Sequence, residues 1–309
     1  MKQNYLISIV GATAIGKTAL SIALAKHFNS EIISSDSRQF YKEMCIGTAV
    51  PNKEELDQVK HHFIQNRSVF EDYSVGDFER DALKKLDELY KKHNIVTMVG
   101  GSGLYVDAVL NGMDDFPDID SKIREQLKFD LQENGIEYLQ NQLKDLDLET
   151  YQKIDINNHQ RLIRTLEICL GTGKPYASFL NKKKKERSFI PIKIGITAPR
   201  DIIYNRINQR VDIMIEQGLI KEAEKLYPYK HLNALQTVGY KELFKYFDKE
   251  FSLDFSIQEI KKNTRRFAKR QNTWFKKDKE IKWFDYKEDP NEIIKYLNNY
   301  MKVNNGTSS

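Results

Sequence analysis

A phosphate-binding loop is the strongest chemical feature of the sequence. Two glycines separated by four residues are followed by a lysine and a threonine, in the stretch Gly11–Thr18. This spacing lets backbone N–H groups turn inward around phosphate oxygens, and the helix expected after it adds partial positive charge. Lys17 supplies a full charge, and the Thr18 hydroxyl is suited to ligate Mg²⁺. We therefore expect phosphate to be bound by Gly11, Ala12, Thr13, Ala14, Ile15, Gly16, Lys17 and Thr18.

The loop does not identify the reaction. Most chains that carry it bind ATP or another nucleotide and transfer or hydrolyse its γ-phosphate, usually with an acidic residue after an apolar strand. Here the apolar run Ile95–Val99 leads into Gly100–Tyr105 with no acid at its end. This argues against an ordinary ATPase and leaves room for a diphosphate that departs as a leaving group.

An aspartate follows the second apolar run, Glu31–Ser34. If the strands form a doubly wound sheet, Asp36 lies at the carboxyl end of the second strand, beside the phosphate loop. A carboxylate there could bind Mg²⁺, cap the next helix or accept a proton from a nucleophile. The residues alone leave these three roles open.

Short apolar runs predict the strands that must position these side chains. They are bounded mostly by Gly, Asp or Pro, and helical patterns lie between them, as after the first run at Thr18–Phe28. Their continuous apolarity is typical of strands covered by helices on both faces. We predict an α/β fold, a P-loop doubly wound parallel sheet with strands at Leu6–Val10, Glu31–Ser34, Ile95–Val99 and Lys193–Thr197. Ligands on such a sheet lie beyond the carboxyl ends of the strands.

The stretch 116–187 has a different, wholly helical character. It predicts helices at Asp120–Asn134 and Ile136–Leu146, broken by Gly135, and a third at Asn158–Leu170. The third carries an apolar stripe of Leu162, Ile163, Leu166 and Leu170, closed by Gly171, and Lys182–Lys185 is interpreted as a linker. We predict that 116–187 is a helical insertion in a core made of 1–115 and 188–309. That core ends in helices predicted at Arg200–Gln217, Lys221–Leu226 and Ser256–Lys277.

Composition limits the classes of protein. No apolar run is long enough for a membrane helix, and the only cysteines, Cys45 and Cys169, form no metal or disulfide pattern. We therefore expect a cytoplasmic protein with no membrane partner. The net charge is only +5, but Lys261–Lys279 holds nine Lys or Arg against one acid. Such a local patch attracts an anionic polymer more than the total charge does, although a charge run is often only a solvated face.

The chain resembles the tRNA dimethylallyltransferases, also called tRNA isopentenyltransferases, over nearly its whole length. Six segments in the family's order carry the resemblance: Gly11–Thr18, Asp36–Gln39 with Ile46–Ala49, Gly100–Tyr105, His159–Arg164, Val238–Lys241 and Thr264–Phe275. The resemblance implies transfer of the five-carbon group of dimethylallyl diphosphate to N6 of adenosine 37 of tRNA, with release of diphosphate. It implies that Gly11–Thr18 grips this diphosphate with Mg²⁺, and that the RNA partner is the anticodon stem-loop. From the size of the chain we expect a monomer.

The resemblance also assigns residues to the chemistry. Asp36 matches the general base that takes the N6 proton, Ser102 matches a hydroxyl near the reacting centre, and Arg210 matches an arginine aimed at the diphosphate. The positions matched to tRNA contact, or beside such matches, are Asp36, Ser37, Arg38, Gln39, Ser102, Arg124, Gln160, Arg161, Leu162, Ile163, Arg164, Lys269, Arg270, Gln271 and Trp274. Trp274 could belong to the core as readily as to the RNA surface. Tyr240, His61 and His62 are expected only to pack or to cap.

Several positions depart from the family pattern. Ala12 and Ile15 occupy free positions of the phosphate loop, so binding should survive. Arg38 replaces an uncharged residue, Cys45 an acid and Val50 a lysine. These three affect the expected shape of the adenine pocket, but not the base or the diphosphate grip.

Three other functions compete with this one. An isopentenyltransferase that acts on free adenine nucleotides could share the loop and the base, but it needs neither the helical insertion nor the basic Lys261–Lys279 region. A P-loop kinase or ATPase is disfavoured by the missing acid after Val99. An RNA-binding protein with a vestigial site is disfavoured because Lys17, Thr18 and Asp36 are all present.

Overall fold

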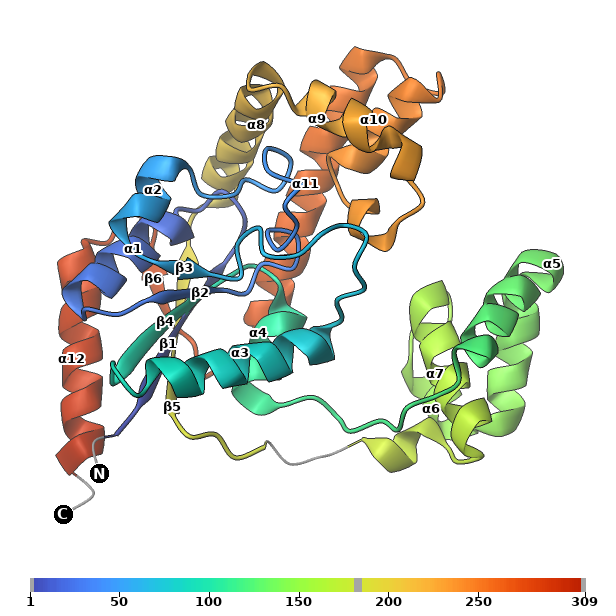
Figure 1. Ribbon diagram of the computed structural model, residues 1–309, viewed down its shortest axis with the longest axis horizontal. Coiled ribbons are helices and arrows are strands. Elements are labelled where there is room, and N and C mark those ends of the chain that lie inside the picture. Colours follow the sequence, from blue (N-terminus) through green and yellow to red (C-terminus); the bar gives the residue numbers. More distant parts are fainter. Residues whose placement is uncertain (1–2, 181–184, 307–309) are drawn as a thin grey trace. The chain divides into compact units, whose positions relative to one another are not determined.

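The computed structural model describes residues 3–180 and 185–306 (Figure 1). The chain divides into two compact units, Met1–Asn111 with Glu186–Ser309 and Gly112–Lys185. We call them the sheet unit and the helical unit. Their boundaries fall four and two residues before the positions predicted from the sequence, which placed them at 115/116 and 187/188. Positions 182–184 of the expected lysine linker lie outside the described residues.

The sheet unit is built on six parallel strands in the order β3-β2-β4-β1-β5-β6. The strands are β1 (Tyr5–Gly11), β2 (Ile32–Ser34), β3 (His61–His62), β4 (Ile95–Val99), β5 (Ile190–Thr197) and β6 (Lys282–Asp285). The four predicted strands correspond to β1, β2, β4 and β5, and the doubly wound α/β class is confirmed. The sequence did not reveal β3 and β6, because both are short edge strands without a buried apolar run.

The central strand β1 explains why the apolar runs do not alternate with polar residues. Leu6 and Val10 pack in a core with α3 (Val75–Leu89) and α4 (Gly103–Asn111). Ile7 and Ile9 pack in a second core with α1 (Lys17–His27), α8 (Arg200–Glu216) and α12 (Pro290–Gly306). Successive side chains of a strand point to opposite faces, so helices cover both faces of this sheet.

A third core holds the remaining helices of the sheet unit. It contains Tyr41 and Met44 together with buried residues of α9 (Leu219–Leu226), α10 (Tyr240–Phe247) and α11 (Leu253–Phe275). The long helix α11 begins beside α10 and reaches α4 (Figure 1). It therefore spans the distance between this core and the loop that follows β4. The short helix α2 (Lys53–Gln58) completes the unit, and 3-10 turns lie at Tyr227–Tyr229 and Asn233–Leu235.

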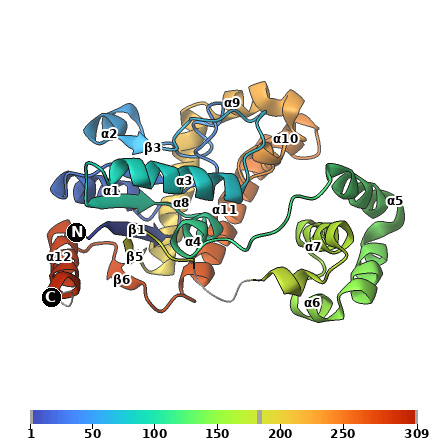
Figure 2. The ribbon, with the colours of Figure 1, turned by 60° about the horizontal axis from the view of Figure 1, so that its bottom comes forward.

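In the helical unit, α5 (Ser121–Leu146), α6 (Leu148–Lys153) and α7 (His159–Thr172) pack together (Figure 2), and a 3-10 turn follows at Tyr176–Phe179. The predicted break in α5 is confirmed, because Gly135 has a non-helical φ of 78°. The predicted end of α7 is wrong. Gly173, at φ 65°, ends the helix, whereas a Cβ on Gly171 would lie 2.6 Å from Ile119. Gly171 thus provides room for a neighbouring side chain inside the helix.

Leu170 was also predicted on the buried stripe of α7, but it is exposed. Cys169, one position earlier, takes its place in the core. No helix in the described part of the chain is both long and apolar enough to cross a membrane.

Candidate active site

The phosphate loop connects β1 to α1, and two glycines give it its shape. Gly11 has φ 145°, and a Cβ there would lie 2.7 Å from the carbonyl oxygen of Ile196. Gly16 is the N-cap of α1 at φ 107°, in the left-handed region that glycine adopts without strain. No side chain caps the first turn of α1, so its backbone N–H groups are available to an anion.

Lys17 folds back over this loop. Its ammonium donates hydrogen bonds to the carbonyl oxygens of Gly11 at 3.0 Å and Ala12 at 2.7 Å. Burial lowers the pKa of Lys17 to about 8, an effect that nearby Asp36 opposes and nearby Arg210 reinforces. A buried ammonium in this state gains when an anionic ligand arrives.

Asp36 lies just beyond β2, on the same edge of the sheet. Its Oδ1 accepts a hydrogen bond from the Arg38 backbone N–H at 3.1 Å. Burial raises the pKa of Asp36, and this backbone hydrogen bond and the charge of Lys17 only partly oppose the rise. The residues after Asp36 form turns and not a helix, so the helix-capping role is excluded.

Ser102 connects the loops that follow β2 and β4. Its Oγ accepts the Ser37 backbone N–H at 3.1 Å and lies 3.1 Å from the Ser37 hydroxyl. The two loops touch because Gly100 has no side chain: a Cβ there would lie 2.2 Å from Ser35 Oγ. The hydroxyl of Ser102 is thereby held against Ser37, the residue that follows Asp36.

Two arginines reach the site from α8. Arg206 Nη1 donates to the Ile15 carbonyl of the phosphate loop at 3.1 Å, and its guanidinium stacks over Tyr286. Arg210 engages in no hydrogen bond or ion pair among the described residues, and burial lowers its pKa. Arg210 is thus a partly desolvated cation without a hydrogen-bonded partner, whereas Arg206 supports the loop. The sequence did not predict the role of Arg206, although it belongs to the same segment as Arg210.

These residues surround a cleft of about 880 Å³ in the sheet unit. Thr13, Asp36, Ser102 and Arg210 line it, as do Gly47–Ala49 and a face of α11. The cleft therefore brings together the three residues that the sequence assigned to chemistry. It meets the phosphate loop at Thr13.

Gln271 on α11 was predicted to contact RNA; it lines the cleft, and its amide also connects two loops of the site. It is only 5% exposed. Its Oε1 accepts the Thr13 backbone N–H at 2.8 Å, and its Nε2 donates to the Gly101 carbonyl at 2.9 Å. Both ends of the amide are thus used to hold the phosphate loop against the loop after β4.

The neighbours of Gln271 remain on the surface. Lys269 and Arg270 are exposed, as expected for a helix face that meets RNA. Trp274 is partly packed and partly exposed, so both of its predicted roles, in the core and on the RNA surface, stay open. Its ring lies against Gly103 and its Nε1 donates to Asp107 at 2.8 Å, yet 40% of the residue is exposed.

The turn Ser37–Gln39 uses its long side chains to hold other segments. Arg38 Nη1 donates to the carbonyls of Asn233 at 3.1 Å and Ala234 at 2.9 Å, which accounts for a charged residue at this position. Gln39 Nε2 donates to the carbonyls of Thr48 at 3.3 Å and Ala49 at 2.9 Å. Both residues therefore shape the walls of the cleft.

In the helical unit, α7 separates a polar face from a core. Gln160 and Arg161 are exposed, and Arg164 is half-buried with its guanidinium 3.0 Å from Glu167 and over the ring of Phe116. Arg124 approaches the same Glu167 at 3.8 Å. The inclusion of Leu162 and Ile163 among the RNA contacts is wrong, because both are buried in the core of this unit.

The site offers few ligands for a metal. Within the described residues no group of three or more His, Cys, Asp or Glu side chains is arranged to hold a metal ion. The Thr18 hydroxyl makes no hydrogen bond within the same residues, and it lies in the first turn of α1. This arrangement fits Mg²⁺, which keeps several waters and takes one or two protein ligands together with substrate phosphates.

Comparison with known proteins shows the family of the chain. Residues 39–278 match the family of IPP transferases. A tRNA dimethylallyltransferase of Flavobacterium psychrophilum is 63% identical over 97% of this chain and 99% of its own length. Another of the same name from Flavobacterium johnsoniae is 62% identical over 95% and 97%.

Solved structures show the same likeness in three dimensions. A tRNA isopentenylpyrophosphate transferase from Bacillus halodurans is 38% identical, with a TM-score of 0.70 over 98% of this chain and 96% of that one. A eukaryotic dimethylallyltransferase acting on tRNA is 26% identical, with a TM-score of 0.82 over 97% of this chain and 80% of that one.

Proposed function

The chain belongs to the IPP transferase family, and we propose that it transfers a dimethylallyl group from dimethylallyl diphosphate to N6 of adenosine 37 in tRNA. The observation that carries the proposal is the position of Asp36, Ser102 and Arg210 around one cleft that adjoins the phosphate loop. A base, a hydroxyl and a cation beside a diphosphate grip fit alkyl transfer with a diphosphate leaving group.

The donor side of the reaction needs positive charge. In the transfer, the bond between the allylic carbon and the diphosphate oxygen breaks, and its electron pair leaves with the diphosphate. Lys17, Arg210 and the backbone N–H groups of Gly11–Thr18 would stabilise the charge that develops on that oxygen. Burial deprives both cations of water and so lowers the pKa of each in the absence of an anion. A bound diphosphate would supply the compensation that water does not.

The acceptor side needs orientation and a proton acceptor. The N6 lone pair forms the new C–N bond, and the N6 proton passes to the carboxylate of Asp36. The raised pKa of Asp36 makes it a better proton acceptor than an exposed aspartate. Ser102 is in place to hold the turn that carries Asp36, through its two contacts with Ser37.

A bound Mg²⁺ would neutralise part of the charge on the diphosphate oxygens. Thr18 is the residue that would ligate it, with water and diphosphate completing the shell. Lys17 and Arg210 would provide the remaining compensation from the protein.

We propose the anticodon stem-loop of tRNA as the substrate, met by exposed positive side chains of both units. Arg161 lies on the polar face of α7, and Lys269 and Arg270 lie on α11. Phosphate contacts of this kind fix position, and the target base must leave its stack to enter the cleft. We place the activity in the cytoplasm. We propose a monomer, because one sheet unit contains every residue assigned to the chemistry.

Transfer of label tests the proposal directly. The protein is incubated with labelled dimethylallyl diphosphate, Mg²⁺ and either the anticodon stem-loop or AMP, and the reaction is repeated with Asp36→Ala. We expect label in the stem-loop only, at a rate that Asp36→Ala lowers strongly. Label in AMP but not in RNA would overturn the RNA substrate, and ATP turnover without transfer would indicate a kinase or ATPase.

A further inference from the structure

One wall of the cleft is a loop whose shape is imposed from outside. Gly47, Thr48 and Ala49 line the cleft, and Ala49 has φ 52°, in the left-handed region that an alanine rarely adopts. A loop in this state keeps its shape only if its surroundings hold it there. Glu222 on α9 and Tyr240 on α10 are the side chains that do so.

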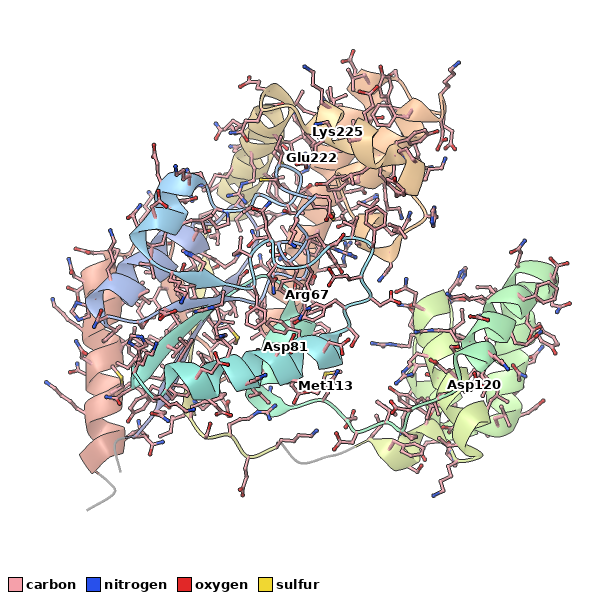
Figure 3. The ribbon with its side chains drawn as sticks, viewed as in Figure 1. Arg67, Asp81, Met113, Asp120, Glu222 and Lys225 are labelled. Atoms are coloured by element: carbon pink, nitrogen blue, oxygen red, sulfur yellow. The ribbon has the colours of Figure 1, made fainter. Side chains whose placement is uncertain are left out.

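Three successive backbone N–H groups converge on the carboxylate of Glu222. Those of Cys45 and Ile46 donate to Oε2 at 3.0 and 2.8 Å, and that of Gly47 donates to Oε1 at 2.9 Å. Successive N–H groups of this kind form an anion-binding concavity, and hydrogen bonds to a carboxylate are stronger than neutral ones. Figure 3 shows Glu222 where α9 meets this loop.

Tyr240 completes the arrangement. Its hydroxyl donates to Glu222 Oε1 at 2.6 Å, and the residue is fully buried. A Cβ on Gly47 would lie 2.6 Å from the Tyr240 ring, so the glycine backbone rests directly against it. The Tyr240 ring limits how closely the loop approaches α10, and the Glu222 carboxylate orients its backbone N–H groups.

The other end of the loop is tied to the segment that carries Asp36. Gln39 donates to the carbonyls of Thr48 and Ala49, and its Oε1 accepts a hydrogen bond from Ser34 Oγ at 3.2 Å. The same Ser34 Oγ lies 3.4 Å from the backbone nitrogen of Asp36, which is placed to donate to it. A displacement of this loop would therefore change the wall of the cleft and also move the segment that carries Asp36.

The phosphate loop has a separate set of supports. Gln271 holds it at Thr13, and Arg206 holds it at Ile15. Among the described residues Glu222 accepts no hydrogen bond from the phosphate loop; its donors are Cys45, Ile46, Gly47 and Tyr240. The two walls of the cleft can thus be disturbed one at a time.

We propose that Glu222 and Tyr240 are positioning residues. They hold the wall formed by Gly47–Ala49 in the shape that receives the RNA base to which the dimethylallyl group is transferred. The proposal rests on the proposed transfer to an RNA base. It assigns to these residues an effect on the RNA substrate and not on dimethylallyl diphosphate.

Steady-state kinetics of Glu222→Gln test it. The amide places an N–H₂ donor against a backbone N–H donor, while size and shape are kept. We expect KM for the stem-loop to rise about tenfold, with KM for dimethylallyl diphosphate unchanged within about twofold. Glu224→Gln, an exposed position on the same helix, is the matched control and should match the wild type.

Two further measurements keep the test decisive if Glu222→Gln folds poorly. Tyr240→Phe keeps the ring against Gly47 and removes only the hydroxyl, so we expect the same split with a rise of about threefold. Amide hydrogen exchange at Cys45–Gly47 should accelerate in both variants. Equal rises in both KM values, or a lower melting temperature with neither KM changed, would overturn the proposal. Absence of transfer by the wild type would instead refute the proposed function.

Discussion

Two loops that line the cleft, the phosphate loop at Thr13 and the loop at Gly47–Ala49, are built on different principles. The phosphate loop takes its shape from its own glycines and from the helix that follows, and remote side chains only brace it. The acceptor wall at Gly47–Ala49 follows no comparable local rule. Its shape depends on Glu222 and Tyr240, which lie more than 170 positions later in the chain. The phosphate grip is therefore determined locally, whereas the wall at Gly47–Ala49 is determined by contacts with distant segments of the chain.

The largest expected effect concerns Asp36, whose segment is tied to the acceptor wall through Ser34 and Gln39. Asp36→Asn keeps the Arg38 N–H contact and removes the proton acceptor, so we expect kcat to fall by about 10²–10⁴. Single-turnover transfer of labelled dimethylallyl groups to the stem-loop measures this. The exposed Asp57→Asn is the control. A variant that retains the full rate would mean that another group accepts the proton.

The pH dependence of binding tests the phosphate side. Because the pKa of Lys17 is lowered to about 8 and an anion prefers the charged form, diphosphate affinity should be greatest below pH 8. Above it, affinity should fall by at most about tenfold per pH unit, since one proton must be taken up on binding. Calorimetry with inorganic diphosphate and Mg²⁺ between pH 7 and 9 checks this.

Thr18→Ala provides the control for that experiment, because it weakens the site but keeps Lys17. The pH profile should persist in it at lower affinity. A flat profile in the wild type would show that Lys17 is charged throughout.

Asp36 should determine the pH dependence of the reaction at low pH. Because the pKa of Asp36 is raised by burial, kcat/KM should begin to fall at a pH above the usual carboxyl range.

The same contrast explains what the sequence could predict. The spacing of Gly11, Gly16 and Lys17 is local, so it identified the phosphate grip, and the apolar runs identified four of the strands. The sequence did not reveal the bracing role of Gln271, because only folding brings its amide between Thr13 and Gly101. Leu162 and Ile163 were included because they sit within a polar motif, although the helical period places them inward.

Glu222 carried no signal at all in the sequence. It is one of many glutamates on amphipathic helices, and the N–H groups that it binds belong to a loop far away in the chain. Tyr240 was expected only to pack or to cap. It packs, and its hydroxyl also orients a carboxylate. Contacts that join distant segments have no periodicity or spacing to reveal them.

A smaller effect than those of Asp36 and Lys17 is expected at Gln271, in the mirror image of the Glu222 experiment. Gln271→Glu keeps the oxygen that accepts from Thr13 but loses the donor to Gly101, so the phosphate loop should shift while the acceptor wall stays. We expect KM for dimethylallyl diphosphate to rise about fivefold, with KM for the stem-loop unchanged within about twofold. Thr273→Ala, exposed on the same helix, is the control. If Gln271→Glu and Glu222→Gln each changed both KM values, the two walls would be one coupled structure and the comparison would fail. Opposite patterns in the two variants would show that donor and acceptor are positioned by separate supports.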